Sequence, residues 1–247
     1  MDTLFISDIH LTRERPDKIR LFIEFLQSPA ARQAAAVYIL GDLFEYFWLG
    51  NDDHTPPVTL ILQEIKDFTR SGSRLYFIRG NRELVMDRGF ELLTGCIMLN
   101  DMTVVEIDGE KILLTHGDVL CTKDVKYQWY RRFMELCLTK KLFLSLPYRL
   151  RSLLVNGLRP LMRRSADRKP PEIIDVDQGA VEASMRRHEV WEIIHGHTHR
   201  PGIHRFTLDG RPASRFVLGD WYLEDSVLVC QGKEKQLLRI EEFLAPG

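Results

Sequence analysis

Five short apolar runs in this chain each end abruptly in a cluster of polar residues. They are Thr3 to Ile6 before Ser7-Asp8, Val37 to Leu40 before Gly41-Asp42, Leu75 to Ile78 before Arg79-Gly80-Asn81, Ile112 to Leu114 before Thr115-His116, and Trp191 to Ile194 before His195-Gly196-His197. Short runs that are rich in Val, Ile, Tyr and Phe and are closed by Gly or polar residues are typical of buried strands. We therefore expect five buried strands, each with polar side chains at its carboxyl end.

Amphipathic segments separate the first three of these strands. Pro16 opens a pattern with one apolar face that continues to Leu26, and a similar stretch runs from Val58 to Arg70. The order strand, helix, strand, helix, strand favours a parallel sheet with helices packed on it. Ligands of such sheets lie beyond the carboxyl ends of the strands, which is where the polar clusters fall.

Two Asp-Gly pairs, Asp108-Gly109 and Asp209-Gly210, lie between apolar stretches and predict hairpin turns. They add antiparallel strands to the parallel ones, so the fold class is α/β with mixed strand directions. A length of 247 residues suits one large domain with an insertion better than two separate domains.

Composition excludes several classes of protein. The chain has 45% hydrophobic and 28% charged residues, which is ordinary for a globular protein and argues against disorder or a fibrous repeat. Its four cysteines are widely spaced and form no C-x-x-C pair, so a reducing compartment fits best. We see neither a signal peptide at Met1 to His10 nor a run of ~20 apolar residues, and expect a cytoplasmic protein with at most peripheral membrane contact.

The net charge of -1 conceals a strongly basic segment. Residues 126–169 carry twelve Lys and Arg against two acidic residues, Glu135 and Asp167, so this segment alone has a charge of +10. We therefore divide the chain into a core, residues 1–125 and 170–247, and a basic amphipathic helical insertion, residues 126–169.

The five strand ends offer side chains that bind metal ions in proteins. The candidate ligands are Asp8, His10, Asp42, Asn81, His116, His197 and His199. Asp8 and His10 occupy alternate positions as the chain leaves a strand, where both can turn toward one cation. The carboxylate of Asp42 has enough lone pairs to bridge two cations.

Taken one at a time, these residues have ordinary structural explanations. A lone Asp at a strand end is usually a turn residue or a helix cap, and a lone His is more often a hydrogen-bonded structural residue than a ligand. Gly-Asp and Gly-Asn are common turn dipeptides. Chance explains the set poorly, because the predicted sheet brings all five loops together.

The ordered pattern D-x-H, G-D, G-N, H-G and G-H-x-H, from Asp8 to His199, resembles the calcineurin-like metallophosphoesterase superfamily. The resemblance implies two packed mixed sheets flanked by helices, with a helical insertion as a lid. It implies two cations, whose ligands are Asp8, His10, Asp42 and His199 for one and Asp42, Asn81, His116 and His197 for the other. Mixed nitrogen and oxygen ligands suit Mn, Fe, Co or Zn better than Mg or Ca. The expected reaction is hydrolysis of a phosphate ester or anhydride.

The third block reads Gly80-Asn81-Arg82-Glu83, whereas general phosphatases and nucleases of the superfamily usually have Gly-Asn-His there. Arginine does not donate a proton at neutral pH, but its planar fork can clamp a phosphate. A leaving group that needs no protonation, such as a phosphate in a pyrophosphate, is therefore favoured. The catalytic candidates are Asp42, Asn81, Arg82 and His116.

Arg82, together with Ile39-Leu-Gly-Asp-Leu-Phe-Glu45, His116-Gly-Asp-Val-Leu-Cys-Thr122 and Ile194-His-Gly-His-Thr-His-Arg-Pro201, resembles the UDP-2,3-diacylglucosamine hydrolase family over nearly the whole chain. That family attacks the α-phosphorus of the UDP moiety, usually with manganese, and makes UMP and lipid X in lipid A biosynthesis. The resemblance implies two Mn²⁺ per chain, with other divalent metals as alternatives. It also implies substrate contacts at Asn81, Arg82, Asp124, Tyr127, Lys169 and His197.

The chain departs from this family at several positions. Glu83 stands where the family typically has Asp, and Tyr46-Phe47-Trp48 includes an extra residue. Met162 and Ala166 fall near positions where polar substrate contacts are expected, and Ser165 compensates only if the register shifts. These differences concern sugar binding more than the chemistry.

Aromatic residues and leucines interleave with Lys and Arg from Tyr127 to Arg164. Such a stretch can lie on an anionic bilayer and accommodate acyl chains. It supports the partners that the resemblance implies, which are a lipid-nucleotide substrate and the cytoplasmic face of the inner membrane. A helical cap whose leucines pack on the core is the structural alternative. A nucleic-acid surface fits the leucine content less well, and no obligate protein partner is indicated.

Two other functions remain open on the sequence alone. A general two-metal phosphodiesterase or nuclease of the same fold shares the candidate ligands, but Arg82 and the leucine-rich insertion argue against it. A noncatalytic binding module with a degraded metal site would be expected to have lost some of those ligands.

Overall fold

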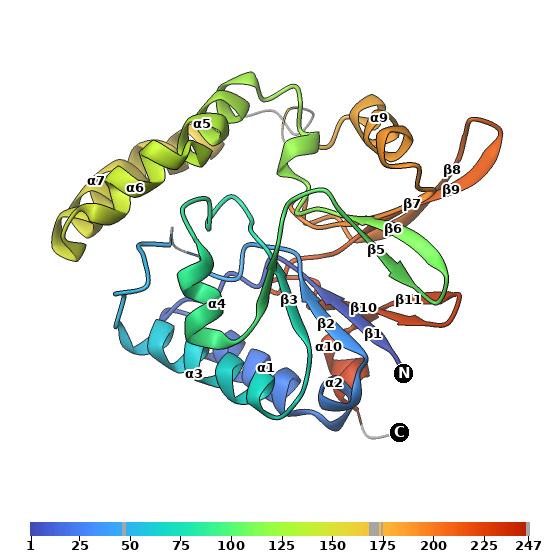
Figure 1. The fold of residues 1–247 in the computed structure, drawn as a ribbon, viewed down its shortest axis with the longest axis horizontal. Helices are drawn as coiled ribbons and strands as arrows, with labels where there is room; N and C mark the ends of the chain where they lie inside the picture. The colour runs from blue at the N-terminus through green and yellow to red at the C-terminus, as the bar shows by residue number, and fades with distance from the viewer. Residues whose placement is uncertain (46–47, 168–172, 174, 246–247) are drawn as a thin grey trace.

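The computed structural model describes residues 1–45, 48–167, 173 and 175–245 of the chain. Two sheets pack face to face, and helices cover the outer face of each, so the core is a four-layer α/β sandwich (Figure 1). The expected fold class, two packed mixed sheets flanked by helices, is confirmed.

The first sheet has the strand order β11-β10-β1-β2-β3-β4. Its strands are β1 (Thr3–Ile6), β2 (Ala36–Ile39), β3 (Leu75–Ile78), β4 (Ile97–Leu99), β10 (Ser226–Gln231) and β11 (Glu234–Arg239). Strands β1 to β4 are parallel to one another, whereas β10 pairs with β1 in the antiparallel direction.

The second sheet has the order β5-β6-β7-β9-β8. Its strands are β5 (Thr103–Ile107), β6 (Glu110–Leu114), β7 (Glu192–His195), β8 (Gly202–Leu208) and β9 (Arg211–Val217). Strand β7 is parallel to both of its neighbours, and the other two pairs are antiparallel hairpins.

Helices cover the outer faces of the two sheets (Figure 1). On the first sheet lie α1 (Pro16–Gln27), α2 (Pro29–Gln33), α3 (Pro56–Arg70), α4 (Arg88–Thr94) and α10 (Ile240–Leu244), and on the second lies α9 (Gln178–His188). A short 3-10 helix, η1 (Asp118–Leu120), follows β6.

Alternation of side chains along the strands explains why two sheets pack together. In β1, Leu4 and Ile6 face the helices of the first sheet, while Phe5 faces the second sheet. In β6, Leu113 packs toward α9, and its neighbours Ile112 and Leu114 face the first sheet. Both faces of β1 and of the carboxyl half of β6 are therefore buried, which accounts for the uninterrupted apolar runs there.

The predicted strands and hairpins are confirmed to within one or two residues. Both Asp-Gly pairs form two-residue hairpin loops, with Asp108 at φ 50° and Gly109 at φ 81°, as a type I′ turn requires. One expectation needs correction, because the five predicted strands do not share a single sheet: β1, β2 and β3 lie in the first sheet, and β6 and β7 lie in the second.

The basic segment forms three consecutive helices that extend beyond the sandwich (Figure 1). They are α5 (Val125–Glu135), α6 (Cys137–Ser145) and α7 (Tyr148–Asp167), and we call them together the helical arm. No residue of α5 or α6 is buried. Met134, Phe143 and Leu144 nevertheless pack against the apolar cluster under the first sheet, so part of the arm rests on the core.

Candidate metal centre

The carboxyl ends of β1, β2, β3, β6 and β7 meet at one edge of the sandwich. Backbone hydrogen bonds join the loops that follow them: Asp8 N donates to Gly41 O (3.0 Å), His10 N donates to Asp42 O (3.0 Å), and Gly196 N donates to His116 O (2.9 Å). The packing of two sheets therefore brings together loops that are far apart in sequence, as in the pair Asp8 and His199, which are 191 residues apart.

Five candidate ligands have a left-handed backbone, which non-glycine residues rarely adopt. They are Asp8 (φ 52°), His10 (φ 51°), Asp42 (φ 52°), His197 (φ 69°) and His199 (φ 54°). Such conformations cost about 1–3 kcal/mol each and persist only where the surrounding structure enforces them. Here they turn side chains of alternate residues toward the same point.

Two glycines allow the loops to approach one another closely. A Cβ atom on Gly80 would collide with the carboxylate and backbone nitrogen of Asp42, and one on Gly196 would collide with Ser7 and Asp8. Both sites are crowded by groups of the candidate centre, so a side chain could enter only by displacing Asp42 or Asp8.

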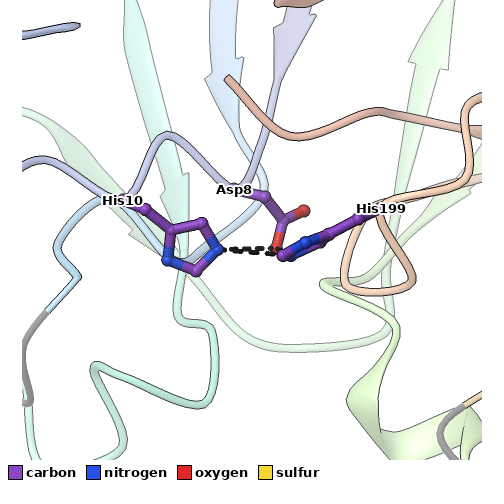
Figure 2. Close-up of side chains that lie close together, drawn as sticks. All are labelled: Asp8, His10 and His199. Atoms are coloured by element: carbon purple, nitrogen blue, oxygen red, sulfur yellow. Dashed lines mark hydrogen bonds and ion pairs between the residues drawn. The ribbon is translucent and has the colours of Figure 1, made fainter. Parts of the chain in front are cut away.

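The first group of ligands consists of Asp8, His10 and His199. Figure 2 shows the two imidazoles and the carboxylate directed toward one point. His199 Nε2 lies 3.2 Å from both Asp8 Oδ1 and His10 Nε2, and His10 Nε2 is 3.8 Å from Asp8 Oδ1. Three donor atoms at these separations can coordinate one cation.

The second group surrounds Asp42 and His116. His116 Nε2 lies 3.7 Å from Asp42 Oδ1, 3.2 Å from Asn81 Oδ1 and 3.2 Å from His197 Nδ1. The other carboxylate oxygen, Asp42 Oδ2, is 3.9 Å from His10 Nε2 of the first group. Asp42 therefore offers one oxygen to each group, which is the arrangement that a bridging ligand needs.

Three imidazoles have an oxygen acceptor close to their second nitrogen. His10 Nδ1 lies 3.2 Å from Glu45 Oε2, His199 Nδ1 lies 3.0 Å from Asp220 Oδ2, and His116 Nδ1 donates to Leu40 O at 2.8 Å. Such contacts direct the remaining nitrogen toward a metal. Sequence reasoning assigned no role to Glu45 or Asp220; Glu45 lies in a quoted motif, whereas no sequence signal marks Asp220.

The raised pKa values of two histidines show that the buried carboxylates of the site favour positive charge. Burial by itself lowers the pKa of His116, but the carboxylates of Asp42 and Asp8 outweigh it and raise that pKa to about 9. Burial by itself also lowers the pKa of His199, but the hydrogen bonds that His199 donates to Asp220 and Asp8 outweigh it and raise that pKa to about 10. The carboxylates thus attract positive charge strongly. The nitrogen and oxygen donors of the whole site fit a divalent transition metal.

Glu83, one of the departures from the family pattern, lies under the centre and is fully buried. Its carboxylate accepts hydrogen bonds from the backbone nitrogens of Asp42 (2.9 Å), Gly80 (3.0 Å) and Phe44 (3.2 Å). Burial and the charge of Asp42 raise the pKa of Glu83 to about 7. Glu83, whose side chain is longer than that of Asp, thus connects the loop after β2 to the loop after β3.

The remaining predicted substrate contacts are only partly brought together. Arg82 lies beside the centre, with its backbone nitrogen donating to Asp42 Oδ1 (3.0 Å) and its Nε 3.9 Å from Asp42 Oδ2. Asp124 caps α5 by accepting from Tyr127 N, and the hydroxyl of Tyr127 donates to Asp118. Lys169 lies outside the described residues, as do Tyr46 and Phe47.

Asp118 is a buried residue that sequence reasoning missed. It is two positions after His116 and accepts from Arg131 Nε at 2.9 Å. The signal that could have identified it is its place in the block that begins at His116.

Comparison with known proteins agrees with this geometry. The calcineurin-like phosphoesterase family matches residues 1–201. The UDP-2,3-diacylglucosamine hydrolase of Aeromonas salmonicida is 45% identical over 237 residues, which cover 96% of this chain and 92% of that protein. The protein of the same name from Pseudomonas entomophila is 43% identical over 218 residues, covering 88% of this chain and 90% of the relative.

Among solved structures, an archaeal phosphodiesterase aligns with a TM-score of 0.50 and 16% identity. The alignment covers 96% of this chain and 99% of the archaeal one. At this level of identity the likeness shows a shared fold.

Metal loading of this centre should release protons. Because the pKa values of His116 and His199 are raised to about 9 and about 10, both imidazoles are protonated at pH 7 in the metal-free protein and must lose their protons to bind a metal. We expect calorimetric titration with Mn²⁺ in buffers of different ionisation enthalpy to show proton release at pH 7. The release should diminish, and the affinity rise, as the pH approaches 10.

A His188→Ala variant is the matched control for this experiment, because His188 bonds to Ser184 O on α9 and contacts none of the candidate ligands. Its proton release should equal that of the wild type. Metal uptake without proton release at pH 7 would show that the imidazoles of the centre are already neutral.

Proposed function

Because this chain belongs to the calcineurin-like phosphoesterase family, and within it to the UDP-2,3-diacylglucosamine hydrolases, we propose that it hydrolyses the pyrophosphate bond of UDP-2,3-diacylglucosamine. The chain is a metal-dependent hydrolase. Its products are UMP and 2,3-diacylglucosamine 1-phosphate, lipid X, in lipid A biosynthesis. Water attacks the α-phosphorus, so the new oxygen enters UMP.

The observation that carries the proposal is the convergence of all seven candidate ligands in one centre, with Arg82 beside it. A noncatalytic module has no need to keep such a set. A general phosphodiesterase or nuclease of the same fold is the second candidate, but no histidine occupies position 82, where a proton donor for the leaving group is expected.

We assign two divalent cations to the centre, with Mn²⁺ as the metal. Asp8, His10 and His199 would hold one, Asn81, His116 and His197 would hold the other, and Asp42 would contribute to both. When bound, the cations activate water and neutralise charge on the phosphoryl oxygens. The chain itself contributes the fixed orientation of the ligands, through Glu45, Asp220 and the carbonyl of Leu40.

Arg82 is placed to bind the pyrophosphate of the substrate. Its side chain is 38% exposed, and its Nε has no hydrogen-bond acceptor in the described part of the chain. The exposed part of its guanidinium is open to phosphate oxygens, which a planar guanidinium can engage in pairs. Asn81 and His197, which are also candidate metal ligands, are further proposed contacts to the substrate.

Asp124, Tyr127 and Lys169 are proposed substrate contacts from the arm and its flanks. The hydroxyl of Tyr127 donates to Asp118, which is two residues after His116. Tyr127 and Lys169 belong to the proposed insertion, residues 126–169, whereas Asp124 and the metal ligands belong to the proposed core, residues 1–125 and 170–247.

The helical arm has the surface that a peripheral membrane contact requires. Large apolar side chains are exposed along it, among them Trp129 (68%), Leu138 (69%), Leu142 (60%) and Leu153 (71%). Exposed basic residues lie between them, including Lys126, Arg132, Lys141 and Arg149. Within the described residues no helix is long and apolar enough to span a bilayer. We assign the arm to the cytoplasmic face of the inner membrane, where apolar insertion and attraction to anionic lipids act together.

Isotope labelling tests the reaction. Hydrolysis of UDP-2,3-diacylglucosamine with Mn²⁺ in ¹⁸O-water should place the label on UMP, as measured by mass spectrometry, because water attacks the α-phosphorus. A chelator should stop the reaction. Label on the lipid phosphate would refute attack at the α-phosphorus, and equal turnover of a generic phosphodiester would favour the second candidate.

Two variants separate substrate binding from metal binding. Arg82→Ala should lower kcat/KM by about 100-fold, which corresponds to the roughly 1.5–3 kcal/mol of a hydrogen bond to a charged group, while the metal content stays unchanged. Asp42→Ala should abolish turnover and reduce the bound metal, measured by atomic emission. Loss of metal in the Arg82 variant, or near-normal turnover in the Asp42 variant, would contradict these roles.

Vesicle flotation tests the membrane contact. The wild type should float with vesicles containing phosphatidylglycerol, less so at high salt, and Leu142→Asp with Leu153→Asp should reduce the bound fraction because charge is placed on the apolar surface. Leu92→Asp is the matched control, since Leu92 is 86% exposed but lies on α4 of the core. Equal binding to neutral and anionic vesicles, or equal loss in the control, would rule out the arm as the contact.

A further inference from the structure

The near end of the helical arm is fixed to the core by Arg131 of α5. Its Nη2 lies 2.8 Å from Asp101 Oδ2, and its Nε lies 2.9 Å from Asp118 Oδ2. Asp101 in turn accepts from Thr115 Oγ1 at 2.6 Å, one residue before His116. This end of the arm is therefore attached directly beside the metal centre.

The far end of the arm is fixed by a second arginine, Arg151 in the first turn of α7. Its guanidinium bonds to the carboxylate of Asp52 through Nη2, and its Nη1 donates to Leu144 O at 2.9 Å in the last turn of α6. One side chain thus connects α6, α7 and the loop of residues 48–55. Close by, Tyr148 Oη donates to Asp53 Oδ1 at 3.3 Å.

Arg151 is 2% exposed, whereas the side chain of Asp52 is 53% exposed. A buried guanidinium depends on its counter-charge, because removal of one partner leaves an uncompensated charge in a poorly solvated site. The backbone of the loop is shaped around it: Gly50 has φ 127°, and a Cβ at this position would lie 3.0 Å from Arg151 Nη1.

The loop of residues 48–55 is itself connected to the third block of the centre. Trp48 N donates to Arg82 O at 2.9 Å, and Asn51 Nδ2 donates to Asp87 Oδ1 at 3.1 Å at the start of α4. A continuous path of contacts therefore runs from the metal centre along the arm and returns through Asp52 to the backbone of Arg82. Arg151 closes this path at its far end.

We propose that Arg151 is a positioning residue for the diacyl substrate: by bonding to Asp52 it fastens the far end of the helical arm and holds the arm and Arg82 in one fixed arrangement. Arg151 contacts none of the candidate ligands, so it acts through the arm and the loop and not on the reacting atoms. A lipid nucleotide that spans Arg82 and the arm depends on this arrangement for binding. The substrate part of the inference rests on the proposed function.

A charge exchange tests the fastening. We expect Arg151→Glu and Asp52→Arg each to increase hydrogen–deuterium exchange across residues 137–158, and to raise KM for UDP-2,3-diacylglucosamine about tenfold with a smaller change in kcat. The double variant restores opposite charges at the two positions, and its KM should return to within about threefold of the wild type. These factors correspond to the coupling of a contacting pair.

The core provides an internal check in the same experiment, because exchange in β1, β2 and α1 should not change in any variant. The matched control is the exposed pair Arg186 and Asp209, 3.0 Å apart on α9 and the β8–β9 turn. Reversal of its charges should leave both the exchange of residues 137–158 and KM unchanged.

Unchanged exchange and KM in both single variants would overturn the proposal, as would a double variant no better than the worse single one. A wild type that does not cleave the lipid nucleotide, but whose arm loosens in the single variants, would refute the proposed function and its substrate while supporting the fastening by Arg151. The two failures are therefore distinguishable.

Discussion

Two carboxylates, Asp8 and Asp42, are buried where the two sheets of this protein meet, and the rest of the site is organised around them. A buried negative charge is unstable without a positive partner. Burial opposes ionisation of Asp8, but its hydrogen bond with His199 and the nearby histidines keep the pKa of Asp8 well below its usual value. The same attraction that holds imidazolium in the metal-free protein binds a cation when the imidazoles deprotonate. The buried negative charge that stabilises the protonated imidazoles is therefore also the source of the affinity for metal ions.

The fold holds the candidate ligands in backbone conformations that are unfavourable by themselves. Left-handed backbone at Asp8, Asp42 and His199 is unfavourable in isolation, and it is retained because neighbouring loops bond to one another and to buried Glu83. Outside the core, Arg131 and Arg151 play a comparable part for the helical arm, each compensated by acidic residues. The arm thereby keeps its apolar residues exposed while it stays attached near the centre.

Sequence alone was informative wherever the signal was local. The apolar runs predicted the strands because residues buried on both faces must be apolar, and the Asp-Gly pairs predicted both hairpins because few other residues tolerate the required φ. The polar residues that follow the strands supplied the candidate ligands, all of which lie at one edge of the sandwich, and the family pattern divided them between two metals. The partition of the strands between two sheets could not be read in the same way, since a strand buried on both faces looks the same in either sheet.

The amino-acid sequence was sufficient to predict the strands, the residues at their carboxyl ends and the excess of positive charge in the arm. Contacts between distant residues became visible in the folded protein: Asp220 orients His199, and Arg151 bonds to Asp52, which is 99 residues away in sequence. The physical reason is that residue type and spacing report local conformation and burial. Partners distant in the chain are chosen by how the sheets and helices pack.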